Sequence, residues 1–127
     1  MAMRDRGVRR ITPDNFTPGP STPGMRRSEA LSTEQVWSGV VHTAPGAVSG
    51  WHHHGDHESV IYVASGALRM ESGAHGLDVF DAVPGDFVYV APHAIHREGN
   101  TTDDVAMLVV TRSGQGPSVV NVEGPEE

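Results

Sequence analysis

From residue 36 onward, the sequence alternates between short runs of strand-forming residues and pairs of turn-forming residues. Breakers such as Pro45-Gly46 and Pro84-Gly85 separate most of the runs, and no long amphipathic helix interrupts them. Short strands at even spacing are typical of a β-sandwich or a β-barrel. The sequence therefore predicts an all-β domain, with strands at residues 36–43, 48–54, 59–64, 67–71, 77–83, 87–90, 95–98 and 105–112, and a ninth at 118–122.

The length of 127 residues fits one domain with a core of its own. The chain has no cysteine, which excludes a disulfide framework and any thiolate metal site. A metal ion bound by this chain must therefore rely on histidine and carboxylate ligands. No continuous apolar run marks a signal peptide or a membrane-spanning helix, so we expect a cytoplasmic protein.

Residues 1–27 differ in composition from the rest of the chain. They hold four prolines and six of the nine Lys and Arg residues, although the formal net charge of the chain is −7. The arginines form no recognisable nucleic-acid-binding motif, so we expect an extended arm that is solvated or contacts a second subunit. Residues 28–122 would form the barrel domain, in which Ser28 or Ser32 can cap one helical turn at 31–34. Residues 123–127 would form an acidic tail.

Histidines are concentrated in the middle of the chain. Seven of the eight lie from His52 to His96, and four fall within residues 52–57. Successive side chains of a strand point to opposite faces, so His52 and His54 share one face and His53 has the other. An isolated His-x-His is more often a solvated strand face, but this density of imidazoles favours metal ligation. We expect residues 46–58 and 85–100 to line one pocket that holds one metal ion.

Residues 36–112 resemble a small single-domain cupin. The first cupin motif has Gly, five residues, His-x-His, three or four residues, Glu, six residues and Gly. Gly46, His52, His54 and Gly66 match that motif.

The glutamate ligand of the motif has no single counterpart. Counting back from Gly66 gives Ser59, whereas counting forward from the second histidine with three intervening residues gives Glu58, and those two counts hold together only with a bulge in the strand. Strand alternation puts His57 on the face of Ser59, and some cupins replace the glutamate by a histidine. The resemblance therefore implies His57, slightly ahead of Glu58, as an additional ligand.

The second cupin motif has Gly, five residues, Pro-x-Gly, two residues, His, three residues and Asn. Gly85, His96 and Asn100 keep its spacing, while Ala91 stands at the proline position and His93 at that of the second glycine. These changes alter the turn before the ligand but not its register. The resemblance therefore implies His96 as the third ligand.

The resemblance implies a double-stranded β-helix, a jelly-roll-like barrel, preceded by the extended arm. It implies a divalent ion (Fe, Zn, Ni, Mn or Cu) held by His52, His54, His57 and His96. The expected substrate is a small organic molecule with an enolisable carbonyl or aromatic character, and dioxygenase-like chemistry is narrowly favoured. The alternatives are a zinc-type cyclase or isomerase with a polyketide-like substrate and a non-catalytic ligand-binding cupin. Small cupins commonly dimerise through sheet faces or exchanged N-terminal strands, so we expect a homodimer.

For several other residues, the sequence favours a structural role over a functional one. His93 fits an exposed turn better than a proton-transfer group, and His42 and His75 have no motif around them. Arg69 fits a solvated strand face better than an anion site. The aromatic residues are expected in the core or at a subunit interface: Trp37, Trp51, Tyr62, Phe80, Phe87 and Tyr89.

Overall fold

The computed structural model describes residues 7–114 and 119–127. These residues form eleven β-strands and one short 3₁₀ helix, η1 (Pro13–Asn15), which confirms the all-β prediction. None of the helical structure in the described residues is long and apolar enough to cross a membrane. The strands are β1 (Thr17–Pro18), β2 (Met25–Ser32), β3 (Val36–Thr43), β4 (His52–His53), β5 (Ser59–Ser65), β6 (Leu68–Ser72), β7 (Asp78–Ala82), β8 (Phe87–Val90), β9 (His96–Gly99), β10 (Ala106–Ser113) and β11 (Val120–Asn121).

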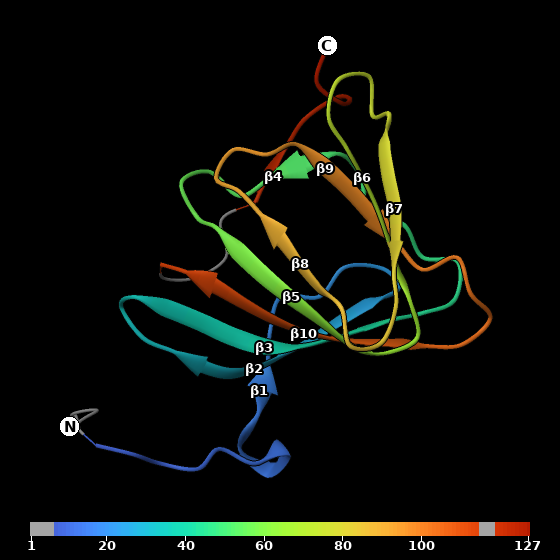
Figure 1. Cartoon of the computed structure of the whole chain (residues 1–127). Coiled ribbons are helices and arrows are strands. Elements are labelled where there is room, and N and C mark those ends of the chain that lie inside the picture. The colour runs from blue at the N-terminus through green and yellow to red at the C-terminus, as the bar shows by residue number, and fades with distance from the viewer. Residues whose placement is uncertain (1–6, 115–118) are drawn as a thin grey trace.

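The strands form two sheets that lie against each other (Figure 1). The first sheet has the order β1-β2-β3-β10-β5-β8, and the second has the order β11-β4-β9-β6-β7. Strands that are distant in the sequence are therefore neighbours in both sheets, as β3 and β10 are in the first and β4 and β9 in the second. This interleaving brings residues 46–58 and residues 85–100 to one region of the molecule.

Most of the predicted strands are present. Those at 36–43 and 87–90 coincide with β3 and β8, and those at 59–64, 67–71, 77–83, 95–98 and 105–112 end within one residue of the prediction. The strand at 48–54 shortens to β4. Ahead of β4, Val48 forms only an isolated bridge to Gly99, and the backbone N–H of Glu98 donates to the Ser49 hydroxyl instead of a backbone carbonyl. The ninth strand is β11, and residue 118 of that prediction lies outside the described residues.

The N-terminal region contains more strand than the sequence suggested. The helical turn at 31–34 is wrong, because residues 31 and 32 complete β2 and Thr33 closes a turn by donating its backbone N–H to the Val36 carbonyl. β2 pairs with β3 along most of its length, and β1 pairs with β2. The boundary drawn after residue 27 therefore falls inside β2.

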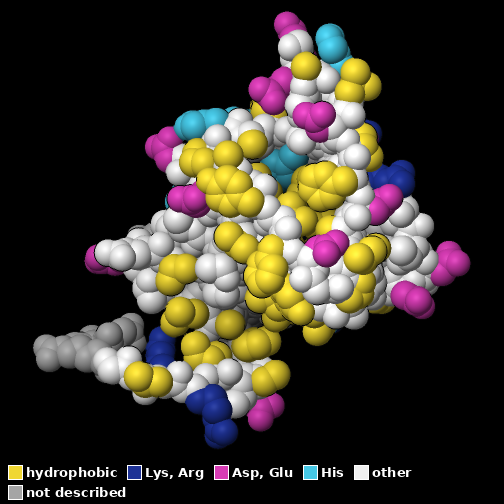
Figure 2. All heavy atoms as spheres, in the orientation of Figure 1, with side chains coloured by type: hydrophobic (Ala, Val, Ile, Leu, Met, Phe, Trp, Pro, Cys, Tyr) yellow, Lys and Arg dark blue, Asp and Glu magenta, His cyan; other side chains and the backbone are white. Residues whose placement is uncertain are grey.

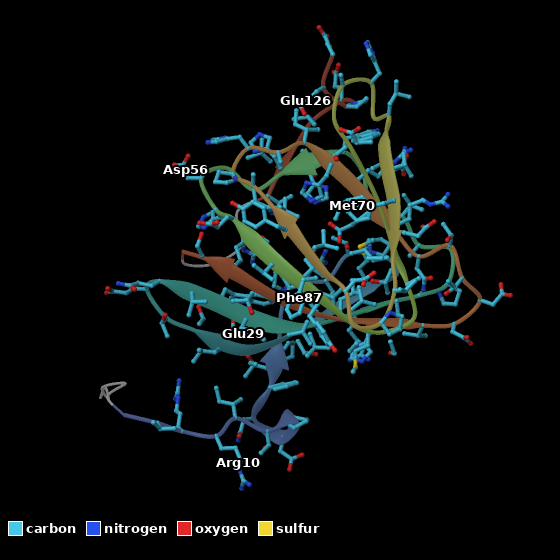
Figure 3. The ribbon with its side chains drawn as sticks, in the orientation of Figure 1. Arg10, Glu29, Asp56, Met70, Phe87 and Glu126 are labelled. Carbon is cyan, nitrogen blue, oxygen red and sulfur yellow. The ribbon has the colours of Figure 1, made fainter. Side chains whose placement is uncertain are left out.

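The core lies between the sheets and is built from alternating strand residues. In β3 and β5 every second side chain is buried or nearly so, as expected for strands with one face inward. Met70 points into this space from β6 (Figure 3). Gly66 joins β5 to β6 with φ +79°, and a Cβ there would lie 2.6 Å from the Ala106 Cα, so the position requires glycine. The core residues are Met25, Val41, Ile61, Val63, Leu68, Met70, Ala82, Val88, Val90 and Leu108.

The aromatic residues divide between the two faces. Trp37 is buried, but Tyr62, Phe87 and Tyr89 lie exposed on the outer face of β5 and β8. Figure 2 shows hydrophobic side chains gathered on the face toward the viewer, over these strands. The core placement is therefore correct for Trp37 and wrong for these three, and their role at a subunit interface stays a prediction.

Candidate functional site

The second sheet positions three of the predicted ligands together. His52 on β4 pairs directly with His96 on β9, and His54 follows just after β4. The ring centroids lie 4.3 Å apart for His52 and His96, 5.0 Å for His52 and His54, and 5.2 Å for His54 and His96. Each residue offers one ring nitrogen, and these atoms lie within 4.8 Å of one another. We call these three residues the histidine cluster.

Backbone carbonyls fix two of the rings. Nδ1 of His52 donates to the Gly50 carbonyl and Nδ1 of His96 donates to the Ala94 carbonyl, both at 2.9 Å. A carbonyl only accepts, so the proton is on Nδ1 and the Nε2 lone pair is free for another partner. A histidine that ligates a metal through one ring nitrogen usually donates a hydrogen bond from the other, as Nδ1 does here.

Glu98 is the neighbour of the cluster that the sequence analysis missed. Its Oε1 lies 3.4 Å from Nε2 of His96 and 3.7 Å from Nε2 of His52, and its side chain is 18% exposed. Strand alternation could have found it, because Glu98 is two residues after His96 on β9 and therefore shares its face. The cupin pattern directed attention instead to residues 57–59.

The carboxylate and the imidazoles shift one another's proton affinities. Burial raises the pKa of Glu98, but the three histidines, His96 foremost, outweigh it and hold this pKa below its ordinary value. Burial lowers the pKa of His96, yet Glu98 and the Ala94 carbonyl together raise it above the ordinary value. Burial also lowers the pKa of His52, and there its effect prevails. Glu98 is therefore an anion beside the cluster at neutral pH.

These residues fit a divalent metal ion. His96 Nε2 is a buried nitrogen without a hydrogen-bond partner, which an ion would satisfy. Two ligands held at about 2.1 Å from one ion lie roughly 3.0–3.4 Å apart, depending on the geometry. The separations of Glu98 Oε1 from the two Nε2 atoms, 3.4 and 3.7 Å, are close to that range. The three histidines could hold an ion through nitrogen, and Glu98 could add an oxygen donor beside His96 and His52.

The structure places the other predicted ligands elsewhere. Nδ1 of His57 donates to the Ser113 carbonyl, and the ring lies against Gly114. Glu58 accepts a hydrogen bond of 2.8 Å from the Tyr89 hydroxyl at the surface. The structure therefore does not bring His57 or Glu58 to the histidine cluster.

The remaining histidines also lie outside the cluster. His53 points away, as strand alternation predicted, and its ring lies 5.7 Å from that of His93. His93 is exposed, as expected, and its Nε2 shares a hydrogen bond of 2.7 Å with the carboxylate of Asp56 in the loop after β4 (Figure 3). His75 is exposed, and His42 is half-buried on β3. Arg69 pairs with Asp81 at the surface, as expected for a residue on a solvated strand face.

Asn100, the last residue of the second motif, has a structural position. It is fully buried, and its Nδ2 donates to the carbonyls of Thr43 and Asp104. Its Oδ1 accepts from the backbone N–H and the hydroxyl of Thr102. These bonds hold the loop between β9 and β10.

The cluster opens on a cavity of about 390 Å³ between the sheets. One wall carries His54, His96 and Glu98 from the second sheet. The opposite wall belongs to the first sheet, and the N-terminal segment closes one side. Figure 2 shows a histidine surface recessed between hydrophobic side chains. The lining residues outside the cluster wall are Pro20, Thr22, Arg27, Trp37, Val41, Ser59, Ile61, Val90, Val110, Arg112 and Val119.

Comparisons with known proteins agree with this architecture. The family model of the cupin domain matches residues 39–112. An uncharacterized conserved protein with a double-stranded β-helix domain, from Klebsiella pneumoniae, is 22% identical with a TM-score of 0.73, covering 92% of this chain and 99% of that chain. KdgF from Halomonas sp. is 23% identical with a TM-score of 0.71, covering 83% of this chain and 94% of that chain. These likenesses confirm the predicted double-stranded β-helix.

A larger enzyme shares the same fold. Oxalate decarboxylase from Bacillus subtilis, in a structure that concerns its Mn(II) centres, is 22% identical with a TM-score of 0.70. The match covers 83% of this chain and 29% of that chain, so this chain spans less than a third of that enzyme. At such identities the likeness shows the fold alone. No curated protein sequence matches the chain.

Proposed function

The chain belongs to the cupin domain family, and from this premise we propose that it is a metal-dependent enzyme acting on a small organic molecule, with dioxygenase-like chemistry narrowly favoured. One observation carries the proposal. The ring nitrogens of the histidine cluster converge beside the Glu98 carboxylate, at the wall of a cavity large enough for a small ligand. A metal held there would face the cavity rather than the protein interior.

The number of donors supports the dioxygenase-like choice. A tetrahedral zinc ion held by three histidines and Glu98 would have every position filled by protein. An ion with six positions, such as Fe(II) or Mn(II), would keep two open for exchangeable partners. Dioxygenase chemistry needs such openings, because a substrate and dioxygen react side by side and both oxygen atoms enter the product. The metal would supply electron transfer between the two.

The protein's own part is positioning and exclusion of water. The carbonyls of Gly50 and Ala94 hold the two imidazoles in the tautomer that presents Nε2 to the site. Glu98 supplies a negative charge that partly neutralises a divalent cation. Valine and isoleucine side chains of the first sheet form an apolar opposite wall, which suits a carbon-rich substrate and limits competing water.

One observation supports the zinc-type cyclase or isomerase as the second candidate. Glu98 lies slightly farther from His52 Nε2 than neighbouring ligands of one ion usually lie from each other, and its side chain retains some exposure. If this carboxylate does not ligate, three histidines leave a zinc ion with an open position, and Glu98 stands ready as a general base beside it. A non-catalytic binding role would use the same cavity without turnover.

Metal analysis combined with oxygen uptake tests the proposal. The protein is purified without added metal, its metal content is measured, and it is then screened against enolisable and aromatic compounds in an oxygen electrode. We expect about one equivalent of a redox-active metal per chain and substrate-dependent oxygen uptake. One equivalent of zinc without uptake would favour the cyclase or binding role. A protein that retains no metal even after reconstitution would refute a metal-dependent enzyme.

A further inference from the structure

We infer that the cavity binds a carboxylate-bearing substrate, and that its carboxylate docks on the guanidinium of Arg112 across from the histidine cluster. The inference rests on the proposed function, because it names the class of molecule on which the metal site would act. It starts from Arg112, a cation on the cavity wall that the metal site does not use.

Arg112 is a buried cation that has no counter-ion among the residues that the structure describes. Only 8% of the residue is exposed, and its Nε has no hydrogen-bond partner. Among residues 7–114 and 119–127, no carboxylate forms an ion pair with it, although surface arginines such as Arg69 and Arg97 each have one. A buried charge is costly unless it is paired, so arginines in such positions usually have an anionic partner. Here the open side of the side chain is the cavity.

The surroundings of Arg112 fix its orientation. Its guanidinium lies 4.9 Å from the centroid of the Trp37 ring, a cation–π contact between neighbouring strands. The ring is held in turn, because Trp37 Nε1 donates to the Glu29 carboxylate at 2.8 Å. Stacking uses the face of the guanidinium and leaves its N–H edge for a planar acceptor. A carboxylate matches that edge with two parallel hydrogen bonds.

A second arginine adds positive charge to the same cavity. Arg27 on β2 also lines it, and its Nη1 donates to two neutral acceptors, the Pro20 carbonyl and the Thr22 hydroxyl. Burial first, and the Arg27 charge second, lower the pKa of Arg112. Among the described lining residues the sole carboxylate is Glu98, which faces the histidines. An incoming anion would relieve the repulsion between the two guanidinium groups.

Ser59 is the residue that faces Arg112 across the sheet, where another side chain could have paired with it. The two residues are paired across β5 and β10, and both are buried. Counting from Gly66, Ser59 occupies the position where the cupin motif has its glutamate. A glutamate there would stand beside Arg112 and could neutralise it, whereas a serine leaves the charge available.

The rest of the cavity defines the body of the ligand. Val41, Ile61, Val90 and Val110 give the first-sheet wall an apolar surface. The volume of about 390 Å³ is at the lower end of the roughly 300–1,000 Å³ typical of ligand pockets. The inferred substrate is therefore a small organic acid, with one carboxylate on Arg112 and an apolar or aromatic body that reaches toward the histidine cluster.

Binding measurements on the metal-loaded protein test the inference. Small carboxylic acids, aromatic and aliphatic, are titrated by calorimetry against their neutral amides, with benzoate and benzamide as one matched pair and phenyl phosphate as a second anion. We expect at least one carboxylate to bind about 10- to 100-fold more tightly than its amide, the range for charge-assisted hydrogen bonds. Arg112→Met, which keeps the length of the side chain, should remove this preference and leave amide binding unchanged.

Two further variants separate the possible outcomes. Ser59→Glu keeps Arg112 but gives it an internal partner, so it should also abolish the carboxylate preference, even if Arg112→Met fails to fold. Arg26→Met changes an exposed arginine of the same strand as Arg27 and should bind like the wild type. Equal affinity for acids and amides across the panel, or tighter binding of the phosphate ester, would overturn the inference. Metal content is measured throughout. If the protein retained no metal but still bound acids through Arg112, the proposed function alone would be refuted. If the protein held its metal and Arg112→Met left the preference for acids over amides unchanged, the Arg112 subsite alone would be refuted.

Discussion

The substitution Glu98→Gln removes the negative charge beside the histidine cluster while keeping the shape of the side chain. If Glu98 ligates the metal, glutamine replaces the carboxylate with a neutral oxygen, which is a weaker ligand. If Glu98 does not ligate it, the substitution still removes a negative charge that stabilises the cation. The Oε1 atom of Glu98 lies 3.4 Å and 3.7 Å from the two nearest imidazole Nε2 atoms, so it is too close to be without effect on an ion they share.

The expected size of the effect follows from this proximity. Loss of groups that support metal ligands costs about 10- to 100-fold in affinity, or roughly 1.4–2.7 kcal/mol, and loss of a direct ligand should lie at or above the upper end. We therefore expect Glu98→Gln to weaken metal binding at least tenfold. The assay is competition with a chelating indicator of known affinity at constant pH, on protein first stripped and then reloaded with each metal.

Three control variants make the result specific. Glu71→Gln removes a carboxylate of the adjacent strand that pairs with Arg97, and it should leave metal affinity unchanged. His57→Ala and Glu58→Ala should also retain the metal, because their side chains bond to Ser113 and Tyr89 instead of facing the cluster. The opposite result would be wild-type metal affinity in Glu98→Gln together with a loss of affinity in His57→Ala or Glu58→Ala. That result would place the fourth ligand in residues 57–58 and refute the role given to Glu98.

The remaining predictions concern the cluster, its acidity, the loop after β9 and the assembly. His96→Ala should remove most of the bound metal while the exposed control His93→Ala keeps it, and full retention in the first variant by elemental analysis would contradict a shared site. Metal occupancy should fall as the pH drops through the imidazole range near about 6.5, because protons compete for Nε2. In the metal-free protein His96 should gain a proton before His52 as the pH falls, because Glu98 and the Ala94 carbonyl raise the pKa of His96 against its burial, whereas burial lowers the pKa of His52. A metal occupancy that stayed constant from about pH 8 to 5 on equilibrium dialysis would contradict the competition between protons and metal. Asn100→Ala should lower the free energy of unfolding by about 2–4 kcal/mol, because it strips partners from buried carbonyls, and a change in the urea midpoint too small for one lost hydrogen bond would refute that role. The homodimer predicts twice the monomer mass in light scattering at micromolar concentration, and a monomeric mass would remove it.

Strand alternation predicted the part of the site that depends on local geometry. It separated His52 and His54 from His53, and the structure shows the same division. The same rule applied to β9 would have placed Glu98 beside His96, two residues away on one face. The cupin motif, in contrast, places its carboxylate ligand near residues 58–59, on another strand.

Other features depend on pairing between distant segments, which single-sequence patterns do not reveal. β2 is rich in polar residues and is half-buried for most of its length, so it lacks the clean alternation that identifies a strand. A register shift between Glu29 and Leu31 further breaks its period. Its place beside β3, which brings Arg27 to the cavity, is a tertiary result. Arg112 is likewise an ordinary strand residue in sequence, and only its folded neighbours show that it is buried and that no described carboxylate pairs with it.

Ser59 and Glu98 together place the carboxylate of the site on the other wall of the cavity from the one that the cupin motif uses. In the cupin motif the carboxylate ligand belongs to the strand that β5 represents, on the same sheet as Arg112. In this chain that strand carries Ser59, and Glu98 supplies a carboxylate from β9 beside His96. The proposed metal site would keep a negative group, while Arg112 on the opposite wall has no carboxylate partner among the described residues. Restoring the family's arrangement with the double substitution Ser59→Glu and Glu98→Gln should therefore retain much of the metal affinity but lose the preference for acids. If the double variant bound acids as the wild type does, the two positions would be independent and this change of wall would carry no functional meaning.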